Sequence, residues 1–179
     1  MTYAEYLAAE EASDVKHEYL RGEVFAMAGG TLEHSRLAVN MAGELRNVLA
    51  GRRCVVFNSD ARLRIAATDR ATYPDVMVVC GHVERAADDP EAIANPVVIV
   101  EVLSDSTEAD DRGEKFAHYR RLASLREYIL VSQRGPRIEV FHREGDHWTF
   151  NEFGPGDSAR LLAIEAALSV EAVYRDPLG

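Results

Sequence analysis

The sequence lacks most of the motifs that identify thiol, zinc and nucleotide chemistry. Its only two cysteines, Cys54 and Cys80, form neither a CxxC pair nor a zinc-binding spacing, and both lie in apolar strand-like segments. We expect free thiols that pack as small hydrophobic side chains. No GxxxxGK, GxGxxG or GxSxG pattern occurs, which argues against a phosphate-loop hydrolase, a dinucleotide enzyme and a nucleophile-elbow hydrolase. Composition alone leaves a Ser/His/Asp triad open.

Tryptophan and long apolar runs are also scarce. Trp148 is the only tryptophan, so the aromatic platform expected of a carboxylate-pair glycosidase is missing. No apolar run approaches the ~20 residues that span a bilayer, and the N-terminus has neither the basic start nor the apolar segment of a secretory signal. The sequence therefore predicts a cytoplasmic protein without membrane contact.

Positive charge is in the minority. The chain has 20 Lys and Arg against 30 Asp and Glu, which gives a formal net charge of −10 and argues against an evenly basic nucleic-acid binder. A locally basic groove remains compatible with this total, because arginines are grouped at 52–53, 62–64 and 120–121. Each such group is more often a solvated face than a phosphate clamp.

The 179 residues, with 47% hydrophobic and 28% charged side chains, are typical of one soluble globular domain, which we expect to span residues 1–179. Helical spacing and capping residues predict helices over 3–12, from Thr31 to near Gly51 and after Ser106 or Thr107, and a short amphipathic segment from Ser169. Apolar runs and alternation predict hairpins over 18–27 and 137–153 and strands over 53–58, 60–66, 73–80, 97–103 and 127–131. The acidic segment 84–91 is expected to be a disordered or variable loop. This order predicts an α/β fold with a mixed central β-sheet flanked by helices and extra antiparallel hairpins.

One carboxylate lies inside the most apolar of these strands. The run 97–103 reads VVIVEVL, so Glu101 is near the centre of a strand that we expect to be buried on both faces. An unpaired ionised carboxylate there would take up a proton or destabilise the fold. Glu101 therefore needs a metal, a cation or a water-lined cleft, and it is the first candidate for function.

A second carboxylate, Asp75, begins the apolar strand that follows Pro74. Proline suits a strand start because it cannot donate a ladder hydrogen bond. If the two strands pair, Asp75 and Glu101 converge, and two close carboxylates stay ionised only with a cation between them. Hard oxygen ligands of this kind suit Mg²⁺ or Mn²⁺.

These residues resemble a known nuclease pattern. Pro74-Asp75 followed by a buried Glu101 resembles the PD-(D/E)xK signature of restriction-endonuclease-like nucleases. The chain resembles the Uma-two family of bacterial endonucleases more closely, in the stretches EVLSDST (101–107), DRGEKFAHY (111–119), SLREYILV (124–131), EYLRGE (18–23) and EHS (33–35). The resemblance covers almost the whole chain and implies a restriction-endonuclease-like core that hydrolyses DNA phosphodiester bonds and leaves a 5′-phosphate.

The sequence departs from the superfamily pattern at Leu103, where the motif has a lysine two residues after the glutamate. A leucine cannot orient a nucleophile. The family resemblance implies that the lysine has moved to the next helix as Lys115, which would reach back over the end of the strand. From the residues alone, Asp111 and Lys115 are an i,i+4 pair on a solvated helix face, worth about 0.3 kcal/mol. That interpretation is kept as the alternative.

Other polar residues near these segments have less support. His34 opens a helix at the border of its apolar face, where a lone histidine is usually structural. In related nucleases the corresponding helix often supplies an acidic residue to the metal site, so His34 and Glu44 are candidates, and we favour His34. We expect Glu18, Glu23 and Asp60 to be surface residues of hairpins or loops.

Together these residues give a specific hypothesis. Asp75, Glu101 and the backbone carbonyl of Val102 would bind Mg²⁺ or Mn²⁺, and Lys115 would position the attacking water or act as the base. The substrate would be DNA, and by analogy with nucleases that cut both strands we expect a homodimer. The alternative is a catalytically inactive nuclease fold that binds DNA or another protein, which Leu103 and the acidic charge favour.

Overall fold

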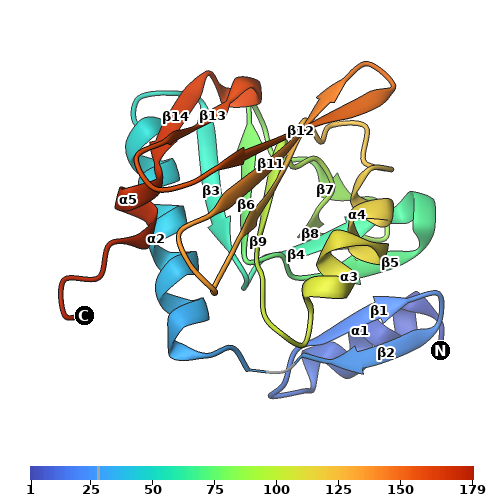
Figure 1. Cartoon of the computed structure of the whole chain (residues 1–179). Coiled ribbons are helices and arrows are strands. Elements are labelled where there is room, and N and C mark those ends of the chain that lie inside the picture. Colours follow the sequence, from blue (N-terminus) through green and yellow to red (C-terminus); the bar gives the residue numbers. More distant parts are fainter. Residues whose placement is uncertain (28) are drawn as a thin grey trace.

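The computed structural model describes residues 1–27 and 29–179 and contains two mixed β-sheets flanked by helices (Figure 1). The main sheet has the order β12-β11-β10-β9-β6-β3. Its strands are β3 (Cys54–Asn58), β6 (Val76–Cys80), β9 (Val98–Val102), β10 (Glu127–Val131), β11 (Ile138–Glu144) and β12 (His147–Phe153). The predicted α/β class, with a mixed central sheet and outer hairpins, is confirmed.

The second sheet has the order β2-β1-β5-β4-β8-β7. Its strands are β1 (His17–Leu20), β2 (Glu23–Ala26), β4 (Arg62–Ile65), β5 (Arg70–Thr72), β7 (Arg85–Ala86) and β8 (Asp89–Ile93). The remaining elements are α1 (Tyr3–Glu11), α2 (Leu32–Val48), the 3-10 turns η1 (Ala66–Thr68) and η2 (Leu162–Ile164), α3 (Glu108–Arg112), α4 (Glu114–Tyr119), the ribbon β13 (Ser158–Leu161) and β14 (Ala166–Ser169), and α5 (Val170–Tyr174). The sequence did not separate this second sheet from the main one, and it did not predict β5, β13 or β14.

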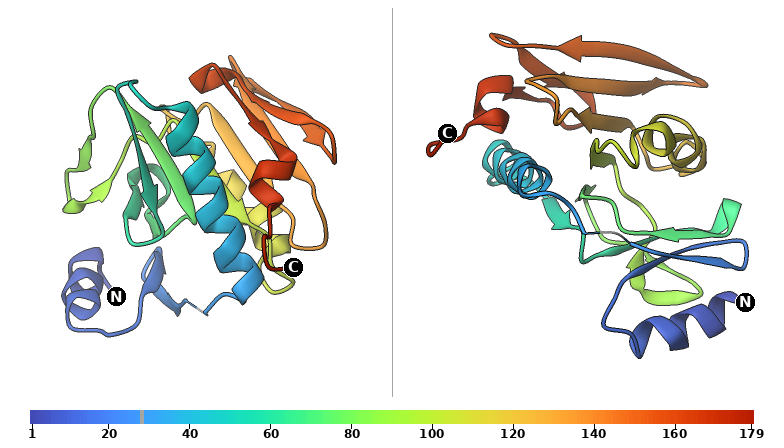
Figure 2. Two further views of the ribbon diagram at one scale, coloured as in Figure 1. Left: turned by 90° about the vertical axis from the view of Figure 1, so that its left-hand side faces the viewer. Right: turned by 60° about the horizontal axis from the view of Figure 1, so that its bottom comes forward.

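Both faces of the main sheet are covered, as the continuous apolar strands predict. Along β9 the side chains alternate, so that Val98, Val100 and Val102 join the core under α2 and α5, while Ile99 joins the core under α4. Figure 2 shows α2 lying across one face of the sheet. Glu101 shares the alternation of Ile99 and therefore points to the α4 side, where a charged group must find partners.

Helix α2 forms where capping and periodicity predict it. The Thr31 side chain accepts a hydrogen bond from the backbone N–H of His34 (3.0 Å), which satisfies one of the free donors of the first turn. Leu37, Met41 and Leu45 recur on one face and are fully buried. Each such side chain contributes roughly 1.5–3 kcal/mol by leaving water, so the face anchors the helix and fixes the direction in which His34 points.

The connection between β9 and β10 holds the residues that approach Glu101. Its two strands are parallel, and the chain between them forms α3 and α4 instead of the single helix predicted after Ser106 or Thr107. The break falls at Gly113, where an added Cβ would lie 3.0 Å from the Ala109 carbonyl oxygen. Thr107 precedes α3, but its hydroxyl donates to the Asp111 carboxylate (2.8 Å) and does not cap the backbone.

The acidic segment 84–91 is not the loop that we predicted from its composition. It forms most of the hairpin β7–β8, because Asp89 is buried and accepts two hydrogen bonds from the Arg62 guanidinium (2.6 and 3.0 Å). The Tyr3 hydroxyl donates a third, at 2.7 Å. The partners of the Asp89 carboxylate, Tyr3 and Arg62, lie far from it in the sequence.

The expectation of free thiols is also wrong. Cys54 and Cys80 stand opposite each other in the antiparallel pair β3–β6 and form a disulfide. Nothing in the local sequence identifies this pairing, because it depends on the register of two strands 26 residues apart. In the described part of the chain, no helix is both long and apolar enough to cross a bilayer.

Candidate catalytic pocket

A cavity of about 380 Å³ opens where the two sheets meet. Its walls come from the hairpin β1–β2, the start of α2, the end of β9, and the segment that contains α3 and α4. The polar and charged side chains that line it are Glu18, Thr31, His34, Tyr73, Asp75, Glu101, Ser104, Ser106, Thr107, Asp110, Asp111 and Lys115. Phe25 and Met27 contribute an apolar edge.

Asp75 and Glu101 meet in this cavity because β6 and β9 are neighbours. The antiparallel register pairs Val76 with Val100, which brings the preceding Asp75 opposite Glu101. An oxygen of Asp75, Oδ2, accepts a hydrogen bond from the backbone N–H of Val102 (2.8 Å), so the carboxylate is fixed to the strand that carries Glu101. The convergence that the sequence predicted is confirmed, while the roles of the two residues stay predictions.

Lys115 lies at the centre of the acidic groups. Its Nζ donates a hydrogen bond to Glu101 Oε1 (3.3 Å) and lies 3.1 Å from Asp111 Oδ1 and 3.6 Å from Glu18 Oε1. Asp111 and Lys115 do form the i,i+4 pair, but they are only 1% and 8% exposed, so this helix face is buried and not solvated. Lys115 thus has the position that the family resemblance implies for the displaced lysine.

Burial and neighbouring negative charges destabilise the ionised form of Glu101. It is 3% exposed, and burial, followed by the like charges of Asp75 and Asp111, raises its pKa to about 8 against the opposing effect of Lys115. The hydroxyl of Tyr119 donates a hydrogen bond to Oε1 (2.6 Å) and lowers the pKa in part. One lysine therefore does not compensate the negative charge gathered around Glu101.

The other titratable groups follow the same logic. Burial alone would lower the pKa of Lys115, but the carboxylates of Glu101, Glu18 and Asp111 outweigh it and hold the pKa well above its usual range. Burial raises the pKa of Asp111, with Lys115 opposing. For Glu18 the attraction of Lys115 and Arg70 exceeds the effect of burial, and the pKa is lowered. Lys115 is accordingly an ammonium. The group of this cluster that changes its protonation nearest to neutral pH is the carboxyl of Glu101.

His34 reaches Asp75 from the first turn of α2. Its Nε2 lies 3.1 Å from Asp75 Oδ2, and this contact raises the pKa of the imidazole. Gly30 makes room for the ring, because a Cβ on this residue would lie 2.9 Å from His34 Nδ1. His34 is therefore held against one carboxylate of the site by close packing as well as by its ion-pair contact.

Several residues of the pocket were missed or misjudged from the sequence. The sequence predicts Glu18 at the surface, but its carboxylate accepts hydrogen bonds from Thr72 (2.6 Å) and Arg70 (2.9 Å) beside Lys115. The β1–β5 pairing that brings these groups together leaves no local signal. From the sequence, Asp111 is only a surface partner of Lys115, and Tyr119 has no predicted contact with the site.

The remaining candidates lie away from the pocket. Glu44 is on α2 and does not line the cavity, and the exposed Glu23 belongs to β2. Asp60 forms an exposed ion pair with Lys16. The expectation that Glu23 and Asp60 are surface residues is correct.

The donor set suits a divalent cation that takes part of its ligands from water. In the residues that the structure describes, no three His, Cys, Asp or Glu side chains form a ready metal cage. However, Asp111 Oδ1 is buried without a hydrogen bond of good geometry, and both polar contacts to the Glu101 carboxylate use Oε1. Two carboxylates on adjacent strands with a surplus of negative charge fit Mg²⁺ or Mn²⁺, which keep several waters as ligands.

Comparison of the sequence with protein families and curated proteins gives consistent matches. The model of the Uma2 family, described as "Putative restriction endonuclease", matches residues 3–172. An uncharacterized protein of Synechocystis sp., slr1290, is 38% identical over 172 residues, which are 96% of this chain and 90% of the relative. A second Synechocystis protein, sll1609, is 36% identical over 162 residues, which are 90% of this chain and 91% of the relative.

The structure resembles a crystal structure described as a putative nuclease belonging to DUF820 from Anabaena variabilis. The TM-score is 0.79 with 16% sequence identity, and the match covers 97% of each chain. At this identity the likeness establishes the fold, and it extends over both sheets.

Proposed function

Because the chain belongs to the Uma2 family of restriction-endonuclease-like proteins, we propose that it is a metal-dependent endonuclease that hydrolyses phosphodiester bonds of DNA. The observation that carries the proposal is the contact of Lys115 with Glu101 beside Asp75. Two carboxylates and a lysine are the side chains of the PD-(D/E)xK pattern, although Leu103 occupies the usual lysine position. The lysine comes from α4 and reaches the same carboxylate.

Asp75, Glu101 and the carbonyl of Val102 would hold the metal, Mg²⁺ or Mn²⁺. When bound, such an ion neutralises the charge that develops on the scissile phosphate. The surplus of carboxylates supports this assignment, since Asp75, Asp111 and Glu101 lie close together with Lys115 as the central cation. The open side of the cavity leaves room for water beside these oxygens.

Lys115 would position the attacking water and stabilise negative charge. Its raised pKa favours the ammonium form, so the residue acts through its charge and its N–H donors and not as a base. Glu101 would remain an ionised metal ligand, because a bound cation stabilises the carboxylate, and its hydrogen bond with Lys115 would hold the ammonium beside the water. Lys115 and Glu101 are joined by one hydrogen bond, so a water that contacts one of them would lie close to the other.

His34 and Tyr119 would act as positioning residues. His34 lies against Asp75 Oδ2, and Tyr119 donates to Glu101 Oε1, so each fixes the orientation of one carboxylate. A catalytic site must hold its groups within a fraction of an ångström, and these two contacts come from packed helices. The division of roles predicts that loss of either residue weakens cleavage without abolishing it.

A second function, DNA or protein binding by an inactive nuclease fold, is favoured by two observations. Leu103 replaces the motif lysine, and the chain carries a net charge of −10. Binding of Mg²⁺ does not separate the two functions, because an inactive site can bind the ion. Cleavage and its loss in defined variants do separate them.

The test is incubation of purified protein with supercoiled plasmid and with single-stranded DNA, in Mg²⁺, in Mn²⁺ and in EDTA. We expect metal-dependent cleavage that disappears in Asp75→Ala, Glu101→Ala and Lys115→Ala, while Glu44→Ala, a carboxylate outside the pocket, keeps it. Unchanged cleavage in the first two variants would disprove the site. Absence of cleavage of every substrate would favour the binding function.

The proposal includes a cytoplasmic location and a homodimer. Simultaneous cleavage of both strands by chains with one active site each takes two chains, which supports the dimer. The Cys54–Cys80 disulfide is unusual for a cytoplasmic protein, so the thiol content of the native protein tests the location.

A further inference from the structure

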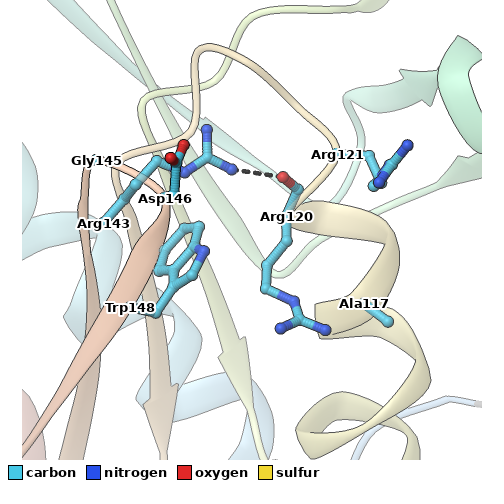
Figure 3. Close-up of a pocket in the computed structure, with 7 residues that line it drawn as sticks. All are labelled: Ala117, Arg120, Arg121, Arg143, Gly145, Asp146 and Trp148. Atoms are coloured by element: carbon cyan, nitrogen blue, oxygen red, sulfur yellow. Dashed lines mark hydrogen bonds between the residues drawn. The ribbon is translucent and has the colours of Figure 1, made fainter.

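A second cavity, of about 540 Å³, lies between the end of α4 and the turn that joins β11 to β12 (Figure 3). It is lined by Ala117, Arg120, Arg121, Arg143, Gly145, Asp146 and Trp148. Three of these seven residues are arginines in a chain of net charge −10, and only Asp146 is acidic. We call this cavity the arginine pocket.

Some arginines elsewhere in the protein are neutralised by buried carboxylates. Arg62 is paired with Asp89 and Arg112 with Glu139, each through two hydrogen bonds. In contrast, Arg120, Arg121 and Arg143 form no ion pair with any residue that the structure describes. Positive charge is therefore concentrated here without an internal counterion.

The guanidinium groups at the arginine pocket make different contacts. Arg143 donates to the backbone carbonyls of Arg120 and Leu122 at the end of α4, as Figure 3 shows for Arg120. It also lies 4.8 Å from the centre of the Trp148 ring. The side chain of Arg120 lies over Phe116, with 5.1 Å between the guanidinium and the ring centre, and leaves its N–H donors to solvent. Arg120 and Arg121 are both exposed and supply the free donors.

Like charges accumulate around this site. Partial burial, and then repulsion by the nearby Arg126, lowers the pKa of Arg143. Repulsion between cations is unfavourable unless an anion is bound. Helix capping explains Arg143, but it does not explain the presence of three further arginines.

Helix α4 connects this pocket to the candidate catalytic pocket. Lys115 is in its first turn and Arg120 directly follows its last residue, so about 7.5 Å of helix axis separates the two positions. Successive phosphates of one DNA strand advance about 3.4 Å along the duplex axis. If the substrate strand follows the surface along α4, its phosphates are spaced closely enough for others to reach Arg120.

We propose that the arginine pocket binds phosphate groups of the substrate nucleic acid outside the catalytic pocket, through Arg120 and Arg121 and independently of base sequence. The choice of substrate class rests on the proposed function. Guanidinium groups present paired N–H donors that match phosphate oxygens, and backbone contacts of this kind supply affinity without sequence recognition. Arg143 holds the end of α4 in place and adds its charge to the same wall.

The only tryptophan of the chain makes the proposal directly measurable. Trp148 lines the arginine pocket and not the candidate catalytic pocket, so its fluorescence should respond to binding at the arginine pocket. The experiment titrates a short DNA duplex, and in parallel the matching single strand, into the protein in EDTA at several salt concentrations. Cleavage is absent under these conditions, and binding is observed alone.

We expect saturable quenching of Trp148 that weakens with salt. Arg120→Ala/Arg121→Ala should lower the affinity about tenfold and reduce the slope of log affinity against log salt by about 2. The matched control, Arg46→Ala/Arg53→Ala, removes two exposed arginines elsewhere and should leave both values near those of the wild type. Arg121→Glu provides a single substitution at an exposed residue and should also weaken binding.

Three outcomes overturn the inference: equal loss in both double variants, DNA binding without a change in Trp148 fluorescence, or saturation by inorganic phosphate at the concentrations that DNA requires. The last would identify a small-anion site. A plasmid cleavage assay with Mg²⁺ is run on the same variants. Arginine-dependent binding by a protein that never cleaves would reject the proposed catalysis and keep this inference. Cleavage and binding that are unaffected by the arginine substitutions would support the proposed catalysis and reject this inference.

Discussion

Tyr119 donates a hydrogen bond of 2.6 Å to Glu101 Oε1, and both side chains are buried. Tyr119 is also a core residue of α4 that packs edge to face against Tyr128. The hydroxyl group thus fixes a candidate catalytic carboxylate from inside the hydrophobic core. A tyrosine that looks structural from its burial has a direct contact with the site.

Tyr119→Phe should impair the site without removing a charge. Loss of the hydrogen bond raises the pKa of Glu101 further, so the pH profile of cleavage should move to higher pH, and stability should fall by about 1–2 kcal/mol. The control is Tyr128→Phe, because that hydroxyl donates to the backbone carbonyl of Asp111. Both variants should lose similar stability, and a pH profile that moves equally in both would contradict the prediction.

The stability of the metal-free protein should depend on Glu101. Burial raises the pKa of this carboxyl from 4.5 to about 8, so between these values the folded protein keeps a proton that the unfolded chain has released. The free energy of unfolding therefore falls as pH rises through this window. In EDTA, Glu101→Gln should lose less stability than the wild type over the same window, by at most about 5 kcal/mol. Urea unfolding across pH measures this, and parallel curves for the two proteins would reject it.

Lys115→Met removes the charge and keeps an unbranched side chain that is one heavy atom shorter. The carboxylates of Glu101, Asp111 and Glu18 then lose their shared cation, so we expect a loss of about 3 kcal/mol at neutral pH. Without the ammonium the pKa of Glu101 rises further, so the loss should shrink as the pH falls below about 8 and this carboxyl takes up its proton first. Mg²⁺ should restore part of the melting temperature by supplying another cation. A melting temperature that ignores Mg²⁺ in this variant would argue against the metal assignment.

The two adjacent glycines before α2 give a matched pair of variants. In Gly30→Ala the new methyl group would lie 2.9 Å from His34 Nδ1, whereas in Gly29→Ala it meets nothing within 4 Å. Displacement of His34 from Asp75 should reduce cleavage about tenfold in Gly30→Ala, and Gly29→Ala should retain activity. Equal activities would show that His34 does not position Asp75.

The part of the site that the sequence predicted is the part carried by strands. A carboxylate inside VVIVEVL is costly wherever the strand lies, so Glu101 could be identified without knowledge of its neighbours. Asp75 followed from the same reasoning and from the pairing of two apolar strands. The position of Lys115 depended on the family resemblance, because nothing local distinguishes it from a surface i,i+4 partner of Asp111.

The predictions that failed depended on contacts between distant segments. Composition made 84–91 a loop, but Arg62 neutralises Asp89 from another strand of the sheet. The alternation of the first hairpin made Glu18 a surface residue, whereas Arg70 and Thr72 cover it. The pairing of Cys54 with Cys80 is likewise a matter of strand register. Local patterns specify the elements, and the partners of buried charges are set by the tertiary arrangement.

Lys115 contacts Glu18 of the second sheet and Glu101 of the main sheet, so a single ammonium group joins the two layers. The proposed active site consequently exists only while the layers are docked. Any partial opening that separates the N-terminal hairpin from the main sheet should abolish the activity before the hydrophobic core unfolds. Activity would then report the integrity of the interface between the two sheets, and a molecule that separates the sheets could inhibit the protein without touching a metal ligand.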